Sequence, residues 1–92
     1  MVLDRAKLVE PEKASIRETL GRALAALHLW PRARREFAKA VAISPADDYA
    51  HFALGVACER TGQRTRAIAH LKLAVAMAPR DEYRKALDRV AS

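Results

Sequence analysis

The chain has 92 residues and a formal net charge of +6, and it is 51% hydrophobic but only 5% aromatic. This length supports one small domain, and no apolar run approaches the roughly 18 to 20 residues of a membrane-spanning helix. Because the sequence contains a single cysteine, Cys58, an internal disulfide framework is excluded.

The N-terminal segment carries charges at Asp4, Arg5 and Lys7, so it lacks the continuous apolar core of a signal peptide. We therefore expect a cytoplasmic protein without a membrane segment. Twelve arginines against five lysines, together with abundant alanine, are typical of a GC-rich bacterial genome. The basic charge is compatible with an anionic partner, although a solvated cationic face explains it more simply.

Apolar residues three and four positions apart predict a succession of helices. The breaks between them carry recognisable signals. Pro45 and Pro79 each end one helix and are followed by acidic residues that begin the next. Thr61-Gly62 closes a helix, and Pro31 lies near the start of another. The expected helices span residues 1–10, 14–27, 31–43, 48–61, 65–77 and 81–91.

The sequence also repeats with a period of 34 residues. A Leu-Gly pair occurs at 20–21 and again at 54–55, and the prolines Pro11, Pro45 and Pro79 have the same spacing. Matching residues precede each proline by five positions (Ala6, Ala40, Ala74) and by eight (Leu3, Phe37, Leu71). A fixed period of this length is the signature of a helical repeat architecture.

The pattern resembles the tetratricopeptide repeat, whose motif is W-x2-L-G-x2-Y, then A-x3-F, then P. The first unit has Arg17, Leu20-Gly21, Leu24, Ala33, Phe37 and Pro45 at these positions. The second has His51, Leu54-Gly55, Cys58, Ala67, Leu71 and Pro79. The chain departs from the motif at the usual tryptophan (Arg17, His51) and the usual tyrosine (Leu24, Cys58), which reduces packing bulk.

This resemblance implies an all-α fold of antiparallel helix pairs, A and B, stacked in a short right-handed solenoid. Gly21 and Gly55 would lie where helix A presses against its neighbour, and the absence of a side chain would permit close approach. The resulting division is a single domain, 1–92, with a half-repeat at 1–13, repeats at 14–47 and 48–81, and a capping helix at 82–92.

In this family, function resides on the concave surface lined by the A helices. Tyr49, Phe52 and Val56 would share one face of a helix, opposite the Leu54-Gly55 packing face. Matching positions in the preceding helix include Glu18 and Arg22. The expected partner-binding residues are Glu18, Arg22, Tyr49, Phe52, Val56 and Arg60. The alternative is that the C-terminal helix itself packs against Tyr49 and Phe52.

No catalytic or metal-binding pattern is found in the sequence, and no cofactor is expected. The three histidines are not spaced at i, i+4 from one another, and no phosphate-binding glycine loop or nucleophile motif occurs. We expect His51 and Cys58 to be core residues and Trp30 to be a packing lid. The carboxylate clamp of chaperone-binding relatives is not reproduced, because Glu18, Arg22 and Ala53 occupy the corresponding positions.

The sequence therefore predicts a non-enzymatic module that binds a protein or peptide segment, or a second copy of itself as a homodimer. The half-repeat would expose Val2, Leu3, Ala6 and Val9, which favours self-association. The alternative is a nucleic-acid-binding protein that uses a basic surface on the B helices. This basic surface would consist of Arg32, Arg34, Arg35, Lys39, Arg64, Arg66 and Lys72.

Overall fold

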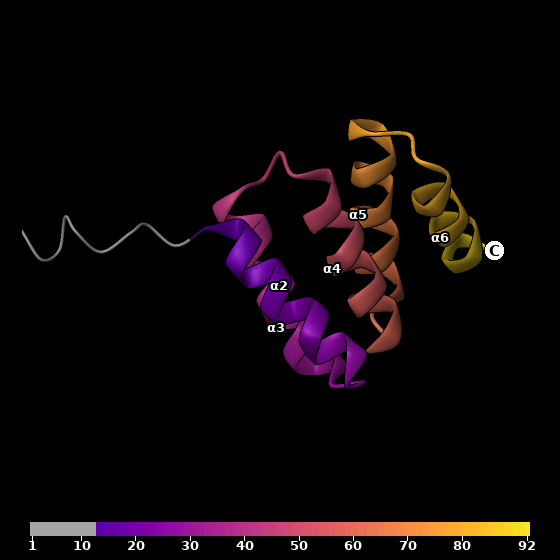
Figure 1. The fold of residues 1–92 in the computed structure, drawn as a ribbon. Coiled ribbons are helices and arrows are strands. Elements are labelled where there is room, and N and C mark those ends of the chain that lie inside the picture. Colours follow the sequence, from indigo (N-terminus) through magenta and orange to yellow (C-terminus); the bar gives the residue numbers. More distant parts are fainter. Residues whose placement is uncertain (1–12) are drawn as a thin grey trace, which may run out of the picture.

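The computed structural model describes residues 13–92, which form five α-helices and contain no strand (Figure 1). These are α2 (Ala14–Ala26), α3 (Trp30–Ile43), α4 (Asp48–Arg60), α5 (Arg64–Met77) and α6 (Asp81–Ala91). Each expected helix from residue 14 onward is confirmed to within one residue at either end. The helix and half-repeat expected before residue 13 lie outside the described residues.

Consecutive helices lie side by side, so that α2 packs on α3, α3 on α4, α4 on α5 and α5 on α6 (Figure 1). Alanines at the expected positions of α3 and α5 are completely buried between the helices: Ala33, Ala40, Ala67 and Ala74. Phe37, Leu54, Leu71 and Cys58 supply most of the larger core side chains. Small residues on one helix and larger ones on the next allow this thin core to close.

The two motif glycines lie at close helix contacts, as expected. A Cβ atom at Gly21 would be 2.6 Å from the Phe37 ring. A Cβ at Gly55 would be 2.7 Å from Leu71 Cγ and 3.2 Å from the Ala67 carbonyl oxygen. Since Phe37 and Leu71 are themselves one period apart, the same packing arrangement occurs in the α2–α3 and α4–α5 hairpins.

Both hairpins also close with the same turn. The Leu29 N–H donates to the Leu24 carbonyl at 2.9 Å, and the Gln63 N–H donates to the Cys58 carbonyl at 2.8 Å. This bond requires a left-handed residue after the helix. In the second hairpin that residue is Gly62, with φ of 79°, and in the first it is His28, with φ of 58°.

The start of α4 is the only helix start from residue 13 onward with a side-chain cap. There the Asp47 carboxylate accepts a bond from the Ala50 N–H at 3.3 Å, in agreement with the expected acidic start. Within residues 13–92, the helices are too short or too polar for any of them to cross a lipid bilayer.

Candidate interaction groove between α2 and α4

A hollow of about 360 Å³ lies between α2, the start of α3, and α4. We refer to it as the groove. Four of the six expected binding residues line it: Arg22, Tyr49, Phe52 and Val56. The other lining residues are Ala25, Ala26, Trp30, Phe37 and Ala53. Alanines on the facing sides of α2 and α4 leave the space, and aromatic residues provide its apolar surface.

Helix α6 covers part of the aromatic surface but leaves the groove in place. The Tyr83 ring stacks on Phe52, with centroids 4.6 Å apart, and Phe52 contacts Tyr49 at 6.1 Å. The Tyr83 hydroxyl donates to Asp48 Oδ2 at 2.7 Å. The alternative expectation, that the C-terminal helix packs against this face, therefore holds for Phe52, whereas Tyr49, Phe52 and Val56 still line the groove.

Two guanidinium groups lie over aromatic rings of the groove. Arg22 Cζ is 5.9 Å from the centroid of Tyr49, and Arg60 Cζ is 5.4 Å from the centroid of Trp30. These are distances at which a cation is attracted to the face of an aromatic ring. Arg60 does not line the groove directly, but its contact with Trp30 places it beside the groove.

Glu18, the sixth expected residue, lies outside the lining of the groove, at the end where α4 begins. Burial raises the pKa of Glu18 to about 7, and a hydrogen bond with Asp47 and repulsion from that carboxylate add to the effect. Arg22 opposes it through its positive charge. At neutral pH Glu18 is therefore protonated for part of the time, because a carboxylate beside another negative charge resists ionisation.

Trp30 is the groove residue whose role the sequence did not predict. It packs against the core, as expected of a lid, but it also lines the groove. The repeat contains no signal for this role, because one period later the equivalent position is Arg64. The contact depends on how the start of α3 meets α4, which is a tertiary relation.

The outer face of α2 departs from the expected packing. Leu20 is 42% exposed although its counterpart Leu54 is only 2% exposed, and the neighbouring Ile16 is 58% exposed. Ser15, Thr19 and Ala23 join them around a shallow, mostly apolar depression. The equivalent face of α4 is covered by preceding helices, whereas none of the helices described from residue 13 onward covers this face of α2.

His51 and Cys58 are confirmed as core residues, since their exposed fractions are 5% and 0%. Burial raises the pKa of the Cys58 thiol, which makes it a poor nucleophile. His51 Nε2 lies 2.8 Å from the Pro45 carbonyl oxygen and donates to it, so Nδ1 is left to accept from His70 Nδ1 at 3.1 Å. Residues 13–92 contain no group of three or more His, Cys, Asp or Glu side chains arranged to hold a metal.

Several members of the basic surface form bonds within the protein. Arg34 donates to Thr61 Oγ1 at 3.2 Å. Arg64 donates to the carbonyl oxygens of Val90 and Ala91 at the end of α6, at 3.0 and 3.3 Å. Arg66 donates to Gln63 Oε1 at 2.8 Å. These arginines therefore stabilise helix ends and turns, which is a structural use of their charge.

In comparisons with known proteins, no family model and no curated protein sequence matches the chain.

Proposed function

We propose that the protein is a non-catalytic interaction module of the tetratricopeptide type. In this proposal the helix pairs form a short right-handed solenoid, and the groove between α2 and α4 binds a segment of another protein in the cytoplasm. The observation that carries the proposal is the groove itself, where half-buried Trp30, Tyr49, Phe52 and Val56 meet around one hollow. Apolar and aromatic surface of this kind is released from water when a partner covers it.

The repeat assignment is supported by contacts that recur at the 34-residue spacing. The glycine contacts at Phe37 and Leu71 and the two turns at His28 and Gly62 are counterparts of each other. A unit that repeats its packing as well as its sequence is what a stacked helical array requires.

Self-association as a homodimer is a second proposal, favoured by the exposed apolar residues of α2. Exposed Ile16 and Leu20 form an apolar surface on a small protein, and such surfaces are commonly buried against a partner. A two-fold contact between copies would bury this face twice.

Nucleic-acid binding through the B helices is the less favoured candidate. Arg34, Arg64 and Arg66 are engaged in internal bonds, which leaves fewer cations for phosphate contacts. Any such binding is expected to be weak and steeply salt-dependent, because phosphate contacts of basic side chains carry no sequence readout. Fluorescence anisotropy with a labelled duplex at low and physiological salt measures this. Tight, sequence-dependent binding at physiological salt would promote this candidate.

The groove is tested with Val56→Glu and the matched control Leu73→Glu. Val56 lines the groove, whereas Leu73 is exposed at 43% on α5, so both variants add one charge to an accessible aliphatic position. Wild type and both variants are used as bait in an extract of the native cells, and the retained proteins are identified by quantitative mass spectrometry. Partners retained by wild type and Leu73→Glu but lost from Val56→Glu would support the groove. Identical partner sets for both variants would contradict it.

A further inference from the structure

We propose that the Trp30–Arg60 end of the groove receives an acidic residue of the bound peptide, next to an apolar side chain that fills the hollow. This inference rests on the proposed function and specifies the chemistry of the partner. It follows from the distribution of charge along the groove, which differs between the two ends.

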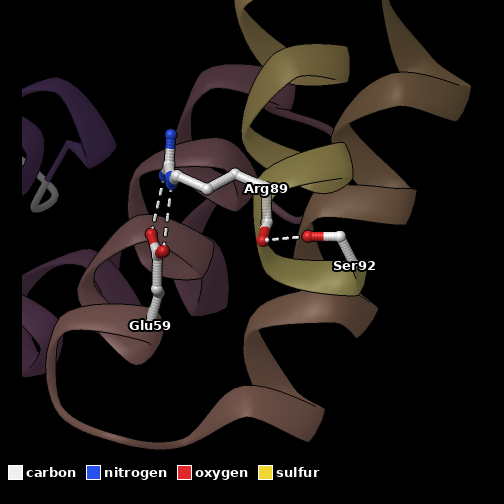
Figure 2. A network of polar contacts seen from close by, with 3 residues as sticks. All are labelled: Glu59, Arg89 and Ser92. Carbon is white, nitrogen blue, oxygen red and sulfur yellow. Dashed lines mark hydrogen bonds and ion pairs between the residues drawn. The ribbon is translucent and has the colours of Figure 1, made fainter.

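At the Trp30 end, the charge of Arg60 is available. Arg60 is exposed and forms no salt bridge within residues 13–92, and its guanidinium lies 5.4 Å from the Trp30 centroid. Its acidic neighbour in sequence, Glu59, is held by Arg89 through two bonds of 3.0 and 2.6 Å (Figure 2). Glu59 is thus directed to α6 and forms no salt bridge with Arg60, although the charge of Arg60 still acts on it at longer range.

At the opposite end, acidic groups outnumber the arginines beside them. Asp48 accepts from Tyr83 and lies 3.7 Å from Arg80. Glu18 is repelled by the carboxyl groups of Asp47 and Asp48, and the positive charge of Arg22 acts on it in the opposite sense. An approaching peptide therefore meets several carboxyl groups at this end and, at the other, a cation that no salt bridge within residues 13–92 holds.

The Arg60 guanidinium, which lies over the Trp30 ring, is oriented to bind a carboxylate of the peptide. A guanidinium that lies over an aromatic ring keeps its N–H edge free to bond both oxygens of a carboxylate. The groove volume of about 360 Å³ lies near the lower end of the roughly 300–1,000 Å³ of small-ligand pockets. That space suits one or two apolar side chains of an extended or helical segment.

Trp30 is the single tryptophan of the chain, so its fluorescence reports directly on this end of the groove. The probes are three capped hexapeptides that differ only in two positions: acetyl-Ala-Leu-Phe-Glu-Glu-Ala-amide, its Gln-Gln analogue and its Lys-Lys analogue. We expect the Glu peptide to bind about three- to tenfold more tightly than the Gln peptide. The Lys peptide should bind most weakly.

The matched variants are Arg60→Gln and Arg84→Gln, which each remove one exposed cation. Arg60→Gln should abolish the preference for the Glu peptide, and Arg84→Gln, on α6, should retain it. Equal affinities for the Glu and Gln peptides, or a preference that survives Arg60→Gln, would overturn this inference.

If in that case both peptides still bind and Val56→Glu abolishes their binding, the proposed function stands. Failure of all three peptides to change Trp30 fluorescence up to about 1 mM would overturn the inference, and the extract experiment would then decide the proposed function separately.

Discussion

His28 occupies a backbone conformation that its repeat counterpart assigns to glycine. The φ angle is 58° at His28 and 79° at Gly62. His28 therefore has a Cβ atom in the left-handed region, which costs about 1 kcal/mol for a non-glycine residue. The imidazole contacts Trp30 edge-on, with centroids 6.4 Å apart, and this contact offsets part of the cost.

We therefore expect His28→Gly to raise the free energy of unfolding by about 0.5–1 kcal/mol, which corresponds to a few degrees in melting temperature. Thermal unfolding followed by circular dichroism measures it. His28→Ala is the control, since it removes the imidazole but keeps the unfavourable φ, and it should not stabilise. A lower melting temperature for the glycine variant would show that the Trp30 contact outweighs the backbone strain.

The close contact at Gly55 gives a prediction of opposite sign. A leucine there must displace Leu71, which lies 2.7 Å from the position of the added Cβ, while the Ala67 carbonyl at 3.2 Å restricts any shift. Gly55→Leu should therefore destabilise by more than the 1–3 kcal/mol typical of an overpacked core. The control Ala69→Leu adds the same side chain at an exposed position of α5 and should leave the melting temperature almost unchanged. A melting temperature for Gly55→Leu equal to or above wild type would refute the packing explanation.

The α4–α5 hairpin contains a histidine, His70, whose contribution to the free energy of unfolding depends on pH. Burial lowers the pKa of His70, and the nearby His51 and Arg66 lower it further. A base with a lowered folded pKa binds fewer protons folded than unfolded. The contribution of His70 to stability is therefore fully present at pH values above its ordinary pKa of 6.5. It is lost as the pH falls below that value.

We expect the stability difference between wild type and His70→Gln to shrink as the pH falls from about 8 to about 5. Chemical denaturation at several pH values measures that difference. Glu18, whose pKa is raised to about 7, favours the folded state at low pH and so changes stability in the opposite direction. Because wild type and His70→Gln both contain Glu18, its effect cancels in the difference between their stabilities. His28→Gln is the control, because it removes an exposed histidine. A difference that does not change with pH would show that the pKa of His70 is not lowered in the folded protein.

The assembly expected of the molecule depends on the exposed apolar residues of α2. We predict that the isolated chain forms a homodimer, because exposed Ile16 and Leu20 lie on a surface that the matching helix α4 buries. The segment with Val2, Leu3, Ala6 and Val9 lies outside the described residues, so its contribution is tested by variants.

Multi-angle light scattering over a concentration series measures the mass of wild type, Ile16→Glu and Leu3→Glu. We expect a dimer for wild type and a shift to monomer in Ile16→Glu. The control Leu73→Glu, an exposed leucine on α5, should behave like wild type. Leu3→Glu shows whether the N-terminal segment takes part in the contact, and Phe52→Glu does the same for the groove. A monomeric wild type at high micromolar concentration would refute self-association.

Local sequence signals were enough to predict the helices from residue 14 onward, their ends and the close glycine contacts within each hairpin. Leu-Gly pairs, alanines and prolines recur at 34 residues, and these residues act on the backbone or on the adjacent helix, so their effect can be predicted from local chemistry. The burial of His51 and Cys58 followed from the same register. Tyr49, Phe52 and Val56 share a helix face by spacing alone, and all three line the same hollow.

Contacts between side chains that do not recur in the repeat depend on how the helices pack. Trp30 lines the groove and His70 contacts His51, although the repeat carries no signal for either of these contacts. Each joins residues on different helices, and the distances depend on how closely those helices pack. Leu20 and Leu54 have the same position in the motif but differ in exposure, because burial depends on the neighbouring helix and not on the residue itself.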